Sequence, residues 1–323
     1  MAVAFEKSIS PEIMSTTSKL TFTNTWDHIL ARWAVNRMGH LVEPGLYSLG
    51  NPTPESPVFV TANYTLSFDA LRSALKGIYG YILVLDTQGV NVWCAAGKGT
   101  FGTDELVKRI EATQLGEVVN HRVLILPQLG APGVSAHDVT KRTHFKVRYG
   151  PVRAEDLPEY LKTGEATPEM RRVRFTLKDR ITLIPVELVA VLLPLLILIL
   201  IGSKGAIAAI LAGAVLFPIL LPWIPTYNFS TKGFILGGIV AIPFMSLAFF
   251  KNPDSALWLR ITWALVYALL IPSITAYLTL NFTGSTTFTS RTGVRREIFA
   301  YIPVMAAMFG IGLLLNIVLI FIH

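Results

Sequence analysis

Cys94 is the residue of this chain whose type and setting best suit chemistry, and it is the only cysteine. A thiolate is a soft metal ligand and a nucleophile. One thiol cannot form an internal disulfide or supply a multi-cysteine zinc or iron–sulfur site. A catalytic cysteine needs a histidine base, and the six histidines show no diagnostic arrangement in the sequence. The choice is therefore between metal ligation by one thiolate and a small buried apolar residue.

The residues around Cys94 favour a ligand that approaches the backbone. They form the run Asn91-Val92-Trp93-Cys94-Ala95-Ala96-Gly97-Lys98-Gly99-Thr100, which is typical of the start of a short helix. Free N–H groups and the helix dipole at such a start favour a thiolate. The alanines and glycines leave room for a broad, flat ligand. The last four residues lack the upstream glycine of a phosphate-binding GxxxxGK[ST] loop, so we do not expect nucleotide binding.

An α/β domain at residues 56–165 is predicted to position this run. Strand-like runs at 58–62, 81–86, 122–126 and 145–149 are separated by helical patterns, among them 68–76 and 104–114. This rhythm indicates a mostly parallel sheet covered on both faces. In such sheets ligands bind at the carboxyl ends of strands, and Cys94 follows the strand at 81–86. Residues 1–55 are expected to form an N-terminal extension.

The second half of the chain is predicted to be an all-α transmembrane domain of five helices, residues 184–323, after a basic linker at 166–183. The chain is 52% hydrophobic, too apolar for an ordinary soluble protein of this length. A helix of about 20 apolar residues crosses roughly 30 Å of hydrocarbon. The expected spans are 184–201, 205–225, 232–250, 257–280 and 298–321.

The charges suggest an orientation in the membrane. Basic residues precede the first and last expected spans (Arg171, Arg172, Arg174; Arg291, Arg295, Arg296), and such residues favour the cytoplasmic side. The N-terminus lacks the pattern of an export signal. We therefore expect a multi-pass protein of the cytoplasmic membrane with its N-terminal domain in the cytoplasm. The net charge of +7 is partly explained by these flanking residues, so no nucleic-acid partner is expected.

The run Asn91 to Lys98 resembles the cap-helix signature of the mercury-methylating corrinoid proteins. Other segments reinforce the resemblance, which covers nearly the whole chain: Ser56-Pro57-Val58, Thr61-Ala62-Asn63-Tyr64, Leu124-Ile125-Leu126-Pro127-Gln128-Leu129-Gly130-Ala131, Tyr149-Gly150-Pro151-Val152-Arg153-Ala154 and the expected five-span half. The soluble domain of that family is similar to the Rossmann-like corrinoid-binding domain of the corrinoid iron–sulfur protein of the acetyl-CoA pathway. The resemblance thus implies a Rossmann-like domain with a cobalamin-type corrinoid as cofactor.

The resemblance also implies roles for individual residues. Cys94 is expected to bind the corrinoid cobalt from the lower face, in place of the base of the nucleotide tail, and so to be the catalytic and metal-binding residue. The remaining expected contacts to the cofactor are Asn91, Val92, Trp93, Ala95, Ala96, Gly97, Lys98, Thr61 and Asn63. The implied activity is that of a methyltransferase, with transfer of a methyl group from cobalt to Hg(II) to give methylmercury.

Partners follow from the same reading. A chain with one cysteine cannot hold a Cys-ligated cluster, so the resemblance implies a low-potential two-cluster ferredoxin as electron donor, together with a methyltetrahydrofolate system or a methyl donor protein.

Two alternative functions stay open. One is a membrane-anchored corrinoid methyl carrier linked to the one-carbon metabolism of the acetyl-CoA pathway. The other is a transporter, which needs a polar path through the spans, whereas Glu187 and Arg260 lie near predicted span ends.

Overall fold

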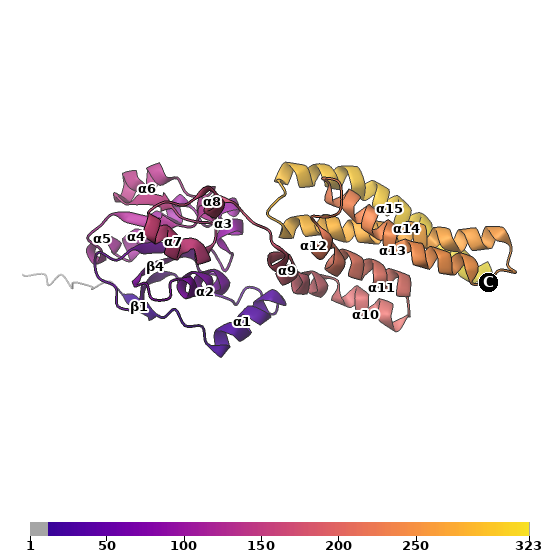
Figure 1. Ribbon diagram of the computed structural model, residues 1–323, viewed down its shortest axis with the longest axis horizontal. Coiled ribbons are helices and arrows are strands. Elements are labelled where there is room, and N and C mark those ends of the chain that lie inside the picture. The colour runs from indigo at the N-terminus through magenta and orange to yellow at the C-terminus, as the bar shows by residue number, and fades with distance from the viewer. Residues whose placement is uncertain (1–11, 323) are drawn as a thin grey trace, which may run out of the picture. The chain divides into compact units, whose positions relative to one another are not determined.

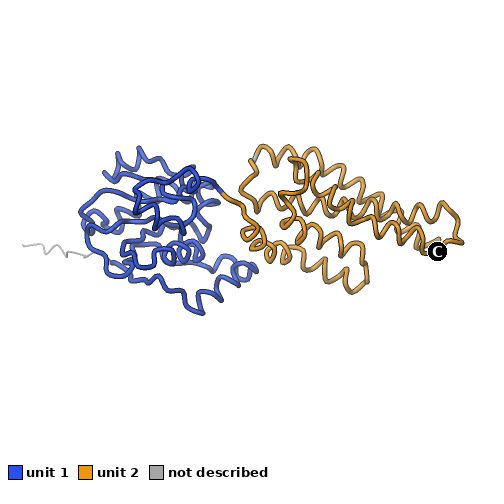
Figure 2. Tube along the Cα trace, in the orientation of Figure 1, with its two compact units in different colours: residues 1–173 blue, residues 174–323 orange. Residues whose placement is uncertain are grey.

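The computed structural model describes residues 12–322 and divides the chain into two compact units, Met1–Val173 and Arg174–His323 (Figure 2). The division falls inside the linker predicted at 166–183. The finer boundaries at residues 55, 165 and 183 remain predictions.

The first unit contains a six-stranded mixed sheet in the order β1-β2-β4-β3-β5-β6. Its strands are β1 (Ile13–Thr16), β2 (Gly45–Leu49), β3 (Val58–Ala62), β4 (Gly80–Leu85), β5 (Val123–Leu126) and β6 (Lys146–Tyr149). The pairing of β2 with β4 is antiparallel, and the other pairings are parallel. The four strands predicted from the apolar runs are confirmed. β1 and β2 were not predicted, because they lie in the segment expected to be an extension.

Helices cover both faces of this sheet, as its central strands require (Figure 1). Every residue of β3 and β4 is buried, and successive side chains enter two separate cores. The core on one face includes residues of α3 (Val92–Lys98), α4 (Thr103–Ala112), α5 (Leu115–Val118) and α6 (Ala136–Thr143). The opposite core includes residues of α2 (Thr65–Ala74), α7 (Leu157–Thr163) and α8 (Pro168–Arg171).

The second unit is helical, and three of its described helices are long and apolar enough to cross a membrane. They are α13 (Phe229–Phe250), α14 (Leu257–Asn281) and α15 (Arg291–Ile322). Before them come α9 (Leu177–Ala190), α10 (Leu192–Leu200), α11 (Lys204–Leu211), the π-helical turn η3 (Ala212–Leu216) and α12 (Phe217–Leu220). The 3₁₀ turn η4 (Phe282–Ser285) follows α14.

The prediction of five spanning helices is therefore not confirmed. The first expected span is broken at Val191 into α9 and α10, which are bent by 64°. Pro194 has no N–H to donate to the carbonyl of Ala190, which explains a break at this point. The second expected span consists of short pieces around a π-helical turn. By length and composition, the described residues contain three spanning helices, or four if the bent pair is one span.

Small residues let α13 and α14 approach closely. A Cβ added at Gly233 would lie 2.5 Å from the Cα of Ala276, and one added at Gly237 would lie 2.6 Å from the Cα of Pro272. The two glycines are four residues apart, which is the GxxxG spacing of membrane helix contacts. The hydroxyl of Thr279 donates to the carbonyl of Phe229 at 3.0 Å across the same contact.

Ionisable side chains in this unit satisfy backbone groups at helix ends. The Glu297 carboxylate accepts from the N–H groups of Phe229 and Ser230 at 3.2 and 3.0 Å, which caps α13. The Lys232 ammonium donates to the carbonyls of Leu221 and Ile224 just after α12. Arg260 donates to the carbonyl of Phe249 at 2.8 Å. Glu187 instead accepts from the Ser285 hydroxyl at 2.6 Å, so each of these groups takes part in a contact within the helical unit.

Candidate functional site

The loop between β4 and α3 is held by the buried side chain of Asn63, which follows β3 directly. Its Oδ1 accepts from the N–H groups of Thr87 and Gly89 at 3.0 and 3.1 Å, and the Thr87 hydroxyl lies 2.9 Å from the same oxygen. Gln88 and Gly89 both have positive φ, so the chain turns sharply here. The Thr87 hydroxyl also lies 2.7 Å from the carbonyl oxygen of Val90, two residues before α3, so these contacts help to fix where that helix begins.

Asn91 caps the helix that carries the thiol. Its Oδ1 accepts from the N–H of Cys94 at 2.9 Å, while its backbone is extended. At the other end, Gly99 adopts the left-handed conformation with φ of 88°, and its N–H bonds to the carbonyl of Ala96. The short helix predicted at Cys94 is confirmed, with both ends defined.

α3 has one buried and one exposed face. Val92, Ala95 and Ala96 enter the core under the helix. The exposed residues within α3 are Trp93, Cys94, Gly97 and Lys98, which we call the thiol face. Their spacing of one and four residues places them on the same side of a helix. The Cys94 thiol is thus open to a ligand, and the interpretation of this cysteine as a small buried residue is wrong.

Open space lies above the middle and the end of this helix. A Cβ added at Gly97 or at Gly99 would meet no heavy atom within 4 Å. From below, a Cβ added at Gly133 would lie 2.9 Å from the Cα of Ala96, so the 130–133 loop packs tightly under the helix. Phe101 is fully buried beside it. The thiol face is therefore rigidly supported below and open above.

The structure separates the predicted site residues into two groups. Asn91 and the thiol face are exposed at the carboxyl edge of β4. The other predicted contacts are buried: Val92, Ala95, Ala96, Thr61 and Asn63. A helix on a sheet turns about half of its residues into the core, which explains why the run divides in this way. The cofactor contacts themselves stay predictions. The role of Asn63 in holding the loop, and the support from Gly133, were not predicted.

The protein alone offers few metal ligands near the thiol. Among residues 12–322, no group of three or more His, Cys, Asp or Glu side chains could hold a metal ion. Because Cys94 is the only cysteine in the sequence, the chain can offer one thiolate to a metal at this position. The hydroxyl of Thr100, just after α3, is buried without a hydrogen-bond partner among the described residues.

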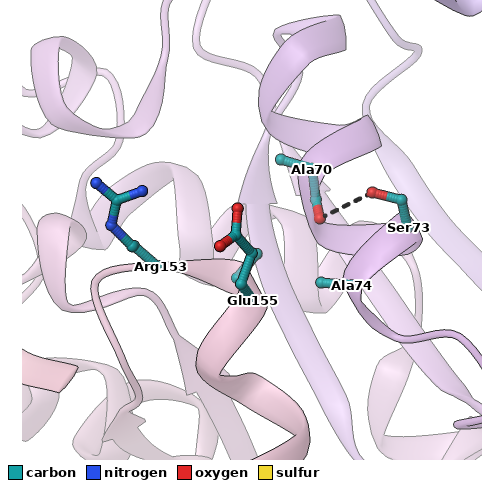
Figure 3. Close-up of a pocket in the computed structure, with 6 residues that line it drawn as sticks. Ala70, Ser73, Ala74, Arg153 and Glu155 are labelled. Carbon is teal, nitrogen blue, oxygen red and sulfur yellow. Dashed lines mark hydrogen bonds between the residues drawn. The ribbon is translucent and has the colours of Figure 1, made fainter. Parts of the chain in front are cut away.

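A separate hollow of about 410 Å³ lies beside α2 (Figure 3). It is lined by Ala70, Ser73, Ala74, Arg153, Ala154 and Glu155. The Ser73 hydroxyl donates to the carbonyl of Ala70 at 3.3 Å, as the dashed line shows. Because α2 covers the sheet face opposite α3, this hollow does not belong to the thiol site.

The site lies within a segment that is similar in sequence to known proteins. Residues 33–161 match the family described as CO dehydrogenase/acetyl-CoA synthase delta subunit. The gamma subunits of the acetyl-CoA decarbonylase/synthase complexes of Archaeoglobus fulgidus and Methanopyrus kandleri are each 37% identical over 123 residues, 38% of this chain. The subunit of Methanocaldococcus jannaschii is 31% identical over 130 residues, or 40% of the chain.

These similarities correct the family and the activity inferred from the cap-helix signature. The matched proteins are subunits of acetyl-CoA complexes, so the predictions of a mercury-methylating protein, of mercury methyltransferase activity and of Hg(II) as substrate are wrong. The chain spans about a quarter of the length of these relatives (26%). The family match, residues 33–161, lies within the sheet unit.

Proposed function

We propose that this chain is a membrane-anchored corrinoid methyl carrier linked to the one-carbon metabolism of acetyl-CoA formation. The observation that carries the proposal is the exposed Cys94 thiol on a glycine-containing helix at the carboxyl edge of β4. That helix lies within the segment similar to acetyl-CoA decarbonylase/synthase subunits. The alternative left open by the sequence is thus preferred to mercury methylation.

The residues at this site fit a corrinoid. A corrinoid would bring its cobalt already bound by the macrocycle, and the single exposed thiol of Cys94 would be the protein's ligand to that metal. A flat macrocycle also requires the space that Gly97 and Gly99 leave above α3. We infer that the thiol face and Asn91 hold the group. When bound, the corrinoid supplies a cobalt that accepts and releases a methyl group.

The protein's own contribution is to position and support the ligand. Asn63 fixes the loop after β4, and Asn91 fixes the first turn of α3. Ala95 and Ala96 anchor that helix in the core, so the sulfur is presented from a rigid element. A thiolate donates electron density to the metal that it ligates, and its surroundings tune that effect. The buried Thr61 and Asn63 act from below the site, without direct contact to the group.

A Rossmann-like description of the domain is part of this proposal. Asn63, Thr87 and Gln128 follow β3, β4 and β5 in turn, and those strands are parallel, so the loops meet at one edge of the sheet. Ligands of doubly wound α/β sheets bind at such an edge. β2 runs antiparallel to β4, which is a departure from a wholly parallel sheet.

Electrons and methyl groups must come from other proteins. The relatives are subunits of a complex, which supports protein partners for this chain. With one cysteine the chain cannot hold a Cys-ligated cluster, so we propose a low-potential two-cluster ferredoxin as electron donor. A methyltetrahydrofolate system or a methyl donor protein supplies the methyl group.

The helical unit is proposed to anchor the protein in the cytoplasmic membrane, with the sheet unit in the cytoplasm. Phe175, before α9, and Phe217, in α12, both pack on Phe282, at 6.4 and 5.8 Å between ring centroids. Residues 177–220 therefore begin and end at the same end of the helical unit. Phe175 also packs on Phe288, just before α15, at 5.4 Å between ring centroids, so Arg295 and Arg296 near the start of α15 belong to the same end. By the positive-inside rule we expect this end to be cytoplasmic.

Binding of a corrinoid to the full chain in detergent micelles tests the function. We expect one corrinoid per chain to be retained on gel filtration after reconstitution, and the loaded chain to accept a labelled methyl group from a methyltetrahydrofolate-dependent methyltransferase. Circular dichroism verifies that the chain is folded. A folded chain that retains no corrinoid would overturn the proposal. Retention without methyl uptake would limit the protein to corrinoid binding and overturn the carrier role.

A further inference from the structure

Helix α1 (Phe22–Arg32) carries its large apolar residues on the side that faces away from the sheet unit. A surface helix normally packs its apolar stripe against the core. Here no residue of α1 is buried. Four large side chains, which we call the α1 stripe, are 40–82% exposed: Phe22, Trp26, Ile29 and Trp33. Their spacing of four, three and four residues places them in one line along the helix.

The opposite side of α1 is polar and attaches the helix to the sheet unit. His28 Nε2 lies 2.8 Å from Asp69 Oδ2 of α2, and Asp27 Oδ1 lies 2.7 Å from His40 Nδ1. Arg72 of α2 donates to the carbonyls of Thr17 and Lys19, just before α1, at 2.6 and 2.9 Å. These specific contacts fix the rotation of the helix, so the outward direction of the α1 stripe is built into the fold.

The composition of the exposed side matches a lipid surface. Tryptophan is enriched where a membrane meets water, and interfacial helices combine aromatic residues with Lys or Arg. Lys19, Arg32 and Arg37 are exposed near the two ends of the α1 stripe, where they can meet anionic headgroups. Val35, Met38 and Leu41 extend the exposed apolar surface, at 48–64% exposure.

The position of α1 in the sequence also favours a lipid surface as its partner. The match to the acetyl-CoA synthase subunit family begins at residue 33 and ends at 161, so α1 and the apolar helices both lie outside it. Only residues 172–176 connect α8 to α9. Five residues span at most about 18 Å, so the sheet unit is held by a short tether to the helical unit.

We propose that the α1 stripe binds the headgroup region of the bilayer in which the helical unit is anchored. The inference rests on the proposed membrane anchoring. A short tether keeps the local lipid concentration high, so a weak interfacial contact suffices to restrain the sheet unit at the membrane.

Spin labels on the full chain in nanodiscs that contain anionic lipid test the inference. In a Cys94→Ser background, single cysteines at Phe22 or Ile29 report on the α1 stripe, and Thr23→Cys lies on the same helix about a quarter turn away. Lys108→Cys on α4 is the aqueous reference, and Ile239→Cys within α13 is the lipid reference; both positions are exposed. The measurement is the ratio of collision with oxygen to collision with a water-soluble nickel complex.

We expect the ratio at positions 22 and 29 to lie between those at 108 and 239, and to exceed that at 23. Ratios equal to that at Lys108 would show a water-exposed stripe and overturn the inference. Low collision with both reagents would show cover by protein, a second copy or a partner, and would also overturn it. An aqueous ratio at Ile239 would instead refute the anchoring itself, and the inference with it, so the two failures are distinguishable.

Discussion

The side-chain oxygen of Asn91 accepts a hydrogen bond from the backbone N–H of Cys94 at 2.9 Å. The residue before the helix thus holds the residue that carries the thiol. The sulfur is presented from the first turn of α3, whose position is set by this cap and by the loop under it. The proposed role of Cys94 therefore depends on side chains that do not touch the ligand.

Asn91→Ala is expected to loosen the first turn of α3. Loss of an N-cap costs about 1 kcal/mol of stability, and the Cys94 N–H loses its acceptor. Hydrogen exchange of peptides from 91–98 should speed up, and corrinoid should bind more weakly. Asn91→Asp keeps an oxygen acceptor and is the matched control, with exchange close to that of the unaltered chain. Equal exchange in the alanine variant would contradict the importance of the cap.

Asn63→Ala is expected to destabilise the sheet unit more than the loss of an exposed amide does. The N–H groups of Thr87 and Gly89 would lose their common acceptor, and a buried unsatisfied donor costs about 1–3 kcal/mol. Asn120→Ala removes an exposed amide that donates to Glu55, and serves as the control with a change within about 0.5 kcal/mol. Denaturant midpoints followed by near-ultraviolet circular dichroism compare the two. Similar midpoints would show that the buried amide is dispensable.

Gly97 allows folding and ligand binding to be tested separately. Gly97→Ala should stabilise α3 by up to about 1 kcal/mol, because glycine is a poor helix former and a Cβ meets open space there. Gly97→Leu should fold, yet weaken corrinoid binding by filling the space that a flat ligand needs. Lys108→Leu is the control for a new exposed leucine and should bind corrinoid normally. Unchanged affinity in Gly97→Leu would place the ligand elsewhere.

The contact of α1 with α2 is expected to weaken in acid. Burial raises the pKa of Asp69, but hydrogen bonds from His28 and Arg72 outweigh that effect, so the net pKa is lowered. A carboxyl with a lowered pKa contributes stability above its unfolded pKa of about 3.9, and the contribution is lost as pH falls through the folded pKa. Asp69→Asn should therefore show a shallower loss of stability below about pH 4. The rate of proteolysis near Arg32 is measured against pH with an acid-stable protease, for the unaltered chain and for Asp69→Asn. Parallel pH curves for the two proteins would contradict the role given to Asp69.

Local apolar runs were enough to predict the central strands and the helix at Cys94. β3 and β4 are buried on both faces, so their sequences are continuously apolar and easily recognised. β1 and β2 are short strands that pair across about thirty residues, a contact that local pattern does not specify. The sequence is apolar on both sides of Val191, so its hydropathy does not reveal the break between α9 and α10.

Only part of the site could be predicted from the sequence, and the physical reasons are similar. The exposed thiol, its cap Asn91 and the small Gly97 follow from residue types within one short run. The function of Asn63 depends on a hydrogen bond to Thr87, 24 residues away, which residue types alone do not reveal. The methyl acceptor was inferred from a resemblance in several short segments and in the apolar half, whereas similarity over 123 residues indicates acetyl-CoA complexes.

The visible absorption spectrum of the corrinoid-loaded full chain, beside that of Cys94→Ala, tests the central claim most directly. Thiolate ligation changes the electronic transitions of the cobalt centre, so the account predicts a spectrum of the unaltered chain that is shifted from that of the variant. Cys94→Ser, which keeps the size but not the soft sulfur, should resemble the alanine variant. Identical spectra for all three folded, loaded proteins would contradict ligation by Cys94.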